Sequence, residues 1–235
     1  LLLLAGVIQI FQASRQTYTM QDGISRLQEN ARYVLGRLSE EISASGYLGC
    51  MESFNQDAVS NNLVNQVNGY DYANPISADN NTGIDATDVL YVRFGSSGGI
   101  PLVSGFDATS TQLVLNDTDP AYDQLEQYDI MTVGDCDGVS IFMVTNDPES
   151  SGGIIQFQSG IVAPSGPNAG QANIAGVFDA PSIAPNAAVG SLASAFKTTS
   201  NTYLVGPSFS GNGNALFVNT IAADNELIQG VEDFQ

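Results

Sequence analysis

The first 45 residues show one pattern of apolar and polar positions, and this pattern changes along its length. Residues 1–11 are almost all apolar, and from Ile24 to Ile42 apolar residues recur at steps of three and four. Such steps draw one stripe down a helix, whereas a segment that is apolar all round belongs in lipid or inside a helix bundle. Because no proline precedes Pro75, the pattern predicts one long helix over residues 1–45.

The two parts of this helix have different expected roles. The first part should lie in lipid or in a helix bundle through Leu1, Leu2, Leu3, Leu4, Val7, Ile8, Ile10 and Phe11. The second part should pack one face on a globular head through Ile24, Leu27, Ala31, Val34, Leu35, Leu38 and Ile42. A helix of about 45 residues is roughly 65 Å long, so part of it should project. Two alternatives stay open: a long core helix with an apolar end, and a coiled coil, whose seam Gly23 and Gly36 would interrupt.

The rest of the chain changes to short segments with the composition of strands. Glycines within residues 45–50 should end the helix. An irregular connection with one short helix near 58–67 follows. Strands are then predicted at 89–94, 112–115, 129–133, 139–145, 154–158, 203–205, 215–219 and 226–234. Residues 134–138 should form a tight hairpin turn, and the proline-rich stretch at about 159–200 a long surface loop. The expected class is therefore α+β, with a helical stalk over 1–45 and a mainly antiparallel β-rich head over 46–235.

The charge is distributed unevenly between these two parts. The chain of 235 residues has a net charge of −19 and only 13% charged residues. Residues 1–42 hold four arginines and four acidic residues, so the whole net charge lies in residues 43–235, where only Arg93 and Lys197 oppose 21 acids. A field of this sign repels nucleic-acid phosphates and anionic lipid headgroups. These numbers exclude a nucleic-acid binder, and a head that works near a membrane would need the helix as its tether.

The two cysteines, Cys50 and Cys136, indicate one disulfide formed outside the cytoplasm, with two unrelated buried thiols as the alternative. The chain has no histidine, so zinc sites and histidine-dependent triads have no basis. Residues 79–85 and 117–123 carry oxygen ligands at alternate positions, as calcium loops do, but lack the spacing of an EF-hand. We therefore expect turns at these acids, and no catalytic residue, cofactor or metal.

The residues resemble type IV pilins, and more narrowly the PilW family of minor pilins. The matching segments are 3–7, 16–18, 25–32 (Ser-Arg-Leu-Gln-Glu-Asn-Ala-Arg), 46–50 (Gly-Tyr-Leu-Gly-Cys), 88–93, 135–136, 202–205 and 226–233. The resemblance covers most of the chain except about 51–85 and 159–200. It implies a precursor with a short leader, cleaved and methylated by a prepilin peptidase. The leader and the family's glutamate would lie upstream of Leu1, and we expect the chain to continue beyond Gln235.

The function that this resemblance implies is non-enzymatic. Minor pilins of this kind sit in the bacterial inner membrane with a periplasmic head, join other minor pilins and the major pilin, and take part in priming and in the tip of the pilus. The helical residues 1–11 would then form part of the membrane segment and of the filament core. Two alternatives stay open: a minor pseudopilin of a type II secretion system, and a membrane-anchored surface adhesin or binding module.

Overall fold

A computed structural model describes the chain over residues 2–49, 56–95, 98–103, 110–135, 138–166, 168–175, 193–211, 213–220 and 223–231, with the backbone alone for residues 2–5, 220, 223 and 224. The helix, residues 1–43, and the head, residues 44–235, form separate compact units, and each is described by itself.

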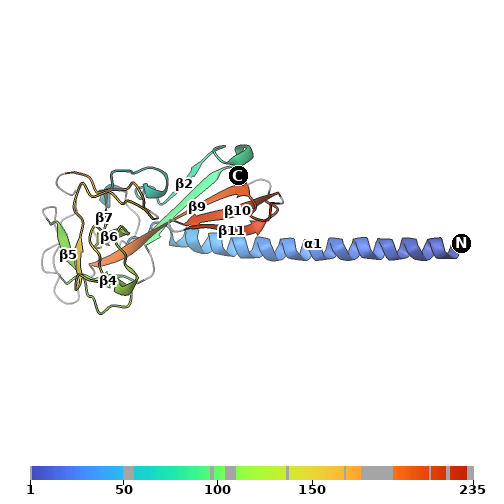
Figure 1. Cartoon of the computed structure of the whole chain (residues 1–235), viewed down its shortest axis with the longest axis horizontal. Helices are drawn as coiled ribbons and strands as arrows, with labels where there is room; N and C mark the ends of the chain where they lie inside the picture. Colours follow the sequence, from blue (N-terminus) through green and yellow to red (C-terminus); the bar gives the residue numbers. More distant parts are fainter. Residues whose placement is uncertain are drawn as a thin grey trace. The chain divides into compact units, whose positions relative to one another are not determined.

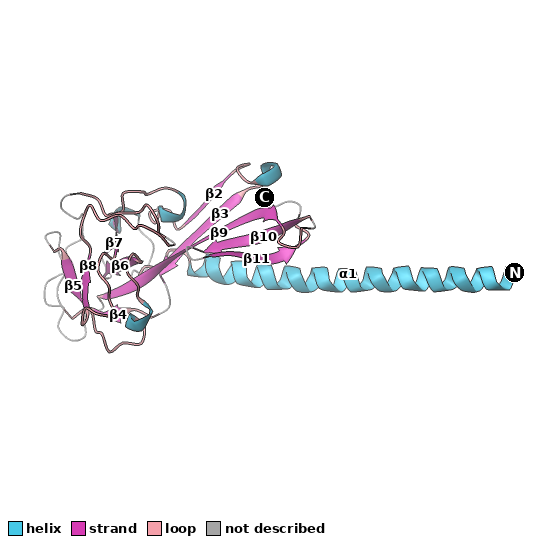
Figure 2. Cartoon of the chain, in the orientation of Figure 1, coloured by secondary structure: helices cyan, strands magenta, loops and turns pink. Residues whose placement is uncertain are grey.

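The first unit is the predicted long helix. α1 runs from Leu2 to Ala44, 43 residues without interruption (Figures 1 and 2), which confirms the expectation. Gly46 follows with a φ of 74°, a left-handed conformation that glycine adopts without steric cost, and it ends the helix as predicted. Beyond this glycine the chain is fixed to the head, since Gly46 N donates to Arg93 O at 3.0 Å and Leu48 is buried. The expected packing of the Ile24–Ile42 stripe on the head stays a prediction.

The head is built from short strands around one long strand. Its strands are β1 (Val59–Asn61), β2 (Ile76–Asp79), β3 (Val89–Gly95), β4 (Ile100–Pro101), β5 (Gln112–Val114), β6 (Ile130–Gly134), β7 (Val139–Met143), β8 (Ile154–Gln156), β9 (Ser194–Pro207), β10 (Asn214–Thr220) and β11 (Ala223–Gln229). The described residues also form four short 3-10 helices. η1 (Gln56–Ala58) precedes β1, and η2 (Asn68–Tyr70), η3 (Ile84–Ala86) and η4 (Tyr122–Gln124) lie between strands.

Strand β9 organises the main sheet. Its first residues pair with β4 and β6, its middle pairs with β3, and its second half pairs with β10 (Figure 2). The sheet order is β1-β7-β6-β9-β10-β11, with β2 added to β3, and a separate two-stranded sheet joins β5 and β8. Every pairing between these strands is antiparallel except that of β1 with β7. The class is therefore α+β, one long N-terminal helix and a curled, mainly antiparallel sheet, as the sequence predicted.

Strands β6 and β7 are buried on both faces and separate two cores. Met131, Val133 and Phe142 face the core completed by β5 and β8, whereas Ile130 and Ile141 face a second core that includes Leu48, Leu63 and Tyr72. Burial on both faces explains why these strands are nearly continuously apolar in sequence instead of alternating. The predicted hairpin of β6 and β7 is confirmed.

Other expectations for the head need correction. The short helix expected near 58–67 is wrong, because Val59–Asn61 forms strand β1. Strands β2 and β4 have no counterpart in the prediction. The long loop expected at about 159–200 ends earlier, since β9 begins at Ser194. The start of β9 reads as polar, with lysine, serine and threonines, yet Thr198 and Ser200 are buried; no periodic apolar pattern marks this strand in the sequence.

Candidate functional site

The first part of α1 presents apolar side chains along the helix itself. Val7, Ile8, Ile10 and Phe11 are between 49% and 71% exposed, and no charged residue precedes Arg15. Several exposed aliphatic and aromatic side chains on one helix segment are typical of a surface that contacts a membrane or another protein. The expected positions Leu1 to Leu4 lie outside the described side chains. Within the described residues, no helix combines the length and the hydropathy needed to cross a membrane.

The second part of α1 is charged but neutral overall. Arg26 pairs with Asp22 at 3.0 Å and Arg37 with Glu41 at 3.1 Å, both one helical turn apart. Such exposed pairs contribute only about 0.3–0.5 kcal/mol each. Among the described residues Arg15 and Arg32 have no acidic partner, so these two guanidinium groups remain available to neighbouring molecules.

The two cations of the head are both engaged inside it. Arg93 on β3 is 1% exposed, and its guanidinium donates to the carbonyl oxygens of Asn68 and Asn74 and to Ser77 Oγ, which fixes η2 and the start of β2 onto the sheet. Burial lowers the pKa of Arg93, while the nearby Asp71 carboxylate opposes this effect. Arg93 is therefore a structural cation that contributes nothing to the surface.

Lys197 is the other cation of the head, and the only lysine of the chain. Its Nζ lies 2.7 Å from Asp129 Oδ2 and donates to Gln124 O at 3.3 Å. Burial raises the pKa of Asp129, and the hydrogen bond from Lys197 counteracts this shift. The net charge of −19 belongs to the head, residues 44–235. Arg93 and Lys197 are the only cations in that part of the sequence, and both are engaged with partners inside the head.

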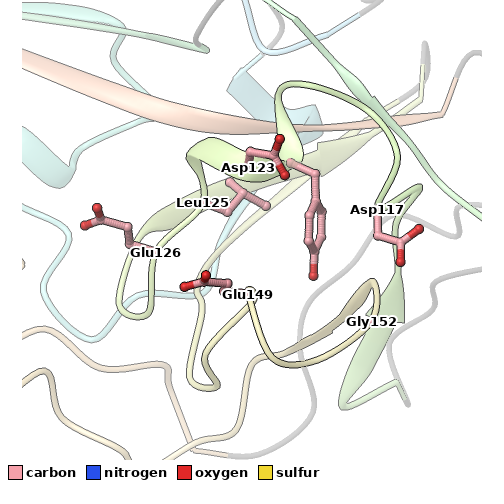
Figure 3. A pocket seen from close by; sticks show the side chains of 7 residues that line it. Asp117, Asp123, Leu125, Glu126, Glu149 and Gly152 are labelled. Atoms are coloured by element: carbon pink, nitrogen blue, oxygen red, sulfur yellow. The ribbon is translucent and has the colours of Figure 1, made fainter.

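Four of these acids surround a pocket beside η4 (Figure 3). Asp117, Asp123, Glu126 and Glu149 line a cavity of about 420 Å³ together with Tyr122 and Leu125. The Tyr122 hydroxyl donates to Pro148 O at 2.8 Å and accepts from Gly153 N at 3.2 Å, so it fastens η4 to the turn that carries Glu149. The pocket has the charge to attract cations and to repel anions.

Two of the acids that the sequence marked as candidate calcium ligands accept hydrogen bonds inside the head, Asp119 in a turn and Asp79 between strands β2 and β3. Asp119 Oδ1 accepts from Ala121 N at 2.9 Å, and Asp79 accepts from the Tyr91 hydroxyl at 3.1 Å. Within the described ranges, no group of three or more His, Cys, Asp or Glu side chains is arranged to hold a metal ion. The other predicted feature, the disulfide between Cys50 and Cys136, lies outside the described residues.

One surface feature has no signal in the sequence. Phe209, in the loop between β9 and β10, is 72% exposed. Its ring meets Phe217 edge to face at a centroid distance of 5.1 Å. The glycines around it announced a loop, but the exposure of the ring follows only from the fold.

Together these features define a chain with a pilin-like combination of parts: a long N-terminal helix with an apolar first part, and a curled antiparallel head. No protein-family model, curated protein or solved structure matches the chain.

Proposed function

We propose that this protein is a structural, non-enzymatic assembly subunit of a type IV pilus, a minor pilin of the PilW kind. The observation that carries the proposal is α1: a single helix of 43 residues whose first part is apolar, uncharged and exposed, placed before a β-rich head. The resemblance of residues 25–32 and 46–50 to minor pilins supports the same assignment.

The physical chemistry of α1 suits a subunit that leaves a membrane to enter a filament. An apolar helix satisfies its own backbone hydrogen bonds in lipid, and it can exchange lipid for the apolar helices of neighbouring subunits without burying a charge. Residues 2–14 span only about 20 Å, less than the roughly 30 Å of a bilayer core.

The proposal places the protein in the bacterial inner membrane with its head in the periplasm, and at the cell surface after assembly. Its partners would be other minor pilins and the major pilin. A minor pseudopilin of a type II secretion system has the same plan of stalk and head. The two assignments differ in the assembly that would contain the protein, which the following experiment distinguishes.

The test compares two glutamate substitutions in α1 of the full precursor in its own cells. Phe11→Glu puts a charge in the apolar part, and Gln28→Glu puts one on the exposed charged part of the same helix. A charge inside the bilayer or filament core costs about 2.5–3.5 kcal/mol, so we expect Phe11→Glu to reduce the protein in sheared pili about tenfold or more. Gln28→Glu should enter pili like the wild type.

Immunoblots of sheared pili and of the cell fraction measure this result. Equal incorporation of both variants would contradict the role of the apolar helix. If the wild-type protein is absent from pili, and deletion of its gene abolishes secretion of an exoprotein, the protein is assigned to the type II secretion system instead of the pilus.

A further inference from the structure

The loop between β9 and β10 presents one large aromatic side chain to solvent. Phe209 is the most exposed of the large apolar side chains of the head within the described residues, at 72%. Its ring meets the ring of Phe217 on β10 edge to face, and Phe217 is 6% exposed. An exposed phenylalanine that rests on a buried ring has a fixed position and a free face.

Hydrogen bonds hold this loop in one conformation. Phe209 N donates to Glu226 Oε2 at 2.6 Å, and Ser208 Oγ donates to the same carboxylate at 3.1 Å. Ser208 N donates to Gly213 O at 3.0 Å, and Gly211 N to Ser208 O at 2.9 Å, which closes the turn. Because these hydrogen bonds position the backbone of Phe209 before any encounter, a partner that binds the ring does not have to position it first.

The charge around the loop restricts what the partner can be. Residues 198–235 contain four acids and no lysine or arginine, and the two cations of the head are engaged with Asn68, Asn74 and Asp129. A second head of this chain would bring the same negative field to the interface, and like charges brought together cost free energy. A protein with a positive rim would instead be attracted by this field.

We propose that Phe209, held by Glu226 in the loop between β9 and β10, is the centre of a docking surface for a different protein subunit, one with an apolar pocket rimmed by lysine or arginine. Phe209 fills the pocket and the Glu226 carboxylate faces the rim. A large aromatic anchor in the centre of a polar rim is the usual composition of an energetic hot spot. The inference rests on the proposed function only in that the partner would be another subunit of the same assembly.

The experiment places the photo-crosslinking residue benzoylphenylalanine at position 209 of the full chain, in its own cells. Position 103 serves as the control, because Val103 is also on the head and is 67% exposed. After irradiation, mass spectrometry identifies the adduct. We expect an adduct from position 209, and none from position 103, with a different protein whose head has a net positive charge.

The two full-length proteins, purified in detergent, then give the affinity of the wild type, Phe209→Ala and Phe209→Tyr. We expect Phe209→Ala to weaken binding about 30-fold or more, Phe209→Tyr to stay within about threefold, and salt to weaken binding of the wild type. Both variants should melt like the wild type, since the ring is mostly exposed. An adduct with another copy of this chain, an acidic partner, equal adducts from both positions, or no adduct would overturn the inference.

This result is separable from the proposed function. A wild-type protein that enters pili but forms no adduct at position 209 refutes the docking surface alone. A protein that forms the adduct but never enters pili refutes the pilus assignment and leaves the inference of a docking surface standing.

Discussion

The side chain of Asn173 replaces a strand at the edge of β7, and its removal should destabilise the head strongly. β1 pairs with β7 only as far as Ile141. Beyond it, Asn173 Nδ2 donates to Met143 O at 2.8 Å, and Met143 N donates to Asn173 Oδ1 at 2.7 Å. The carboxamide therefore continues the ladder by one step. Both residues are buried, so no water can take over these two hydrogen bonds.

The magnitude follows from the two groups that Asn173→Ala leaves unpaired. A buried backbone group without a partner costs about 1–3 kcal/mol, so the pair should cost about 2–6 kcal/mol. Asn146 provides a matched control. Its carboxamide makes the same two contacts, with Ile154 O at 2.8 Å and Gln156 N at 2.7 Å, but it is only partly buried. Water can replace it there, and Asn146→Ala should cost about 1–2 kcal/mol.

Asn173→Asp adds a pH dependence with a defined sign. The carboxylate has the shape of the amide but faces Met143 O without a donor, so burial should raise its pKa above the value in the unfolded chain. At neutral pH the ionised form destabilises the variant relative to the wild type. This difference should shrink as the pH falls through the raised pKa, because the protonated carboxyl can donate to Met143 O again.

Urea denaturation of the wild type and the three variants, at neutral and at mildly acidic pH, measures these differences. Equal losses for Asn173→Ala and Asn146→Ala would refute the role of burial in this argument. An Asn173→Asp variant whose deficit does not change with pH would show that Met143 O does not need the donor.

Three further predictions concern charges and thiols. The hydrogen bond from Phe209 N stabilises the Glu226 carboxylate and lowers the pKa of Glu226 below its ordinary value of 4.5, so the bond is present above this pKa and lost below it. The chemical shift of the Phe209 amide proton in NMR spectra should therefore change with pH around the pKa of Glu226. Glu226→Gln should abolish this change. Lys197→Met should raise the pKa of the buried Asp129 further, because the substitution removes the cation that stabilises its carboxylate. Urea denaturation should therefore show a free energy of unfolding lower by about 1 kcal/mol at neutral pH, and a smaller difference near pH 4. Equal differences at the two pH values would contradict the pairing. If Cys50 and Cys136 form one disulfide, alkylation should increase the mass of the exported protein only when the protein has first been reduced. Two thiols that react without reduction would disprove the disulfide.

The sequence by itself determined the parts of this protein whose signal is local. The 3.6-residue stripe and the absence of proline predicted α1, and Gly46 predicted its end, because helical hydrogen bonds join residues close in the chain. The hairpin of β6 and β7 was likewise evident, since its strands are strongly apolar and its turn is short. The uneven charge was also fixed at this level, as counting needs no coordinates.

Only the tertiary structure decided where polar residues are buried. Asn173, Thr198 and Ser200 lie within the surface loop predicted at about 159–200, yet the fold buries all three. The guanidinium of Arg93, a charged group, is buried as well. The exposure of Phe209 was likewise decided by the fold, because the sequence does not show which strands cover a side chain in a loop. Burial of a polar group is stable only where a distant segment supplies its hydrogen-bond partner, and exposure of an apolar one depends on which strands cover it. Those partners lie tens of residues away, so no local pattern announces them.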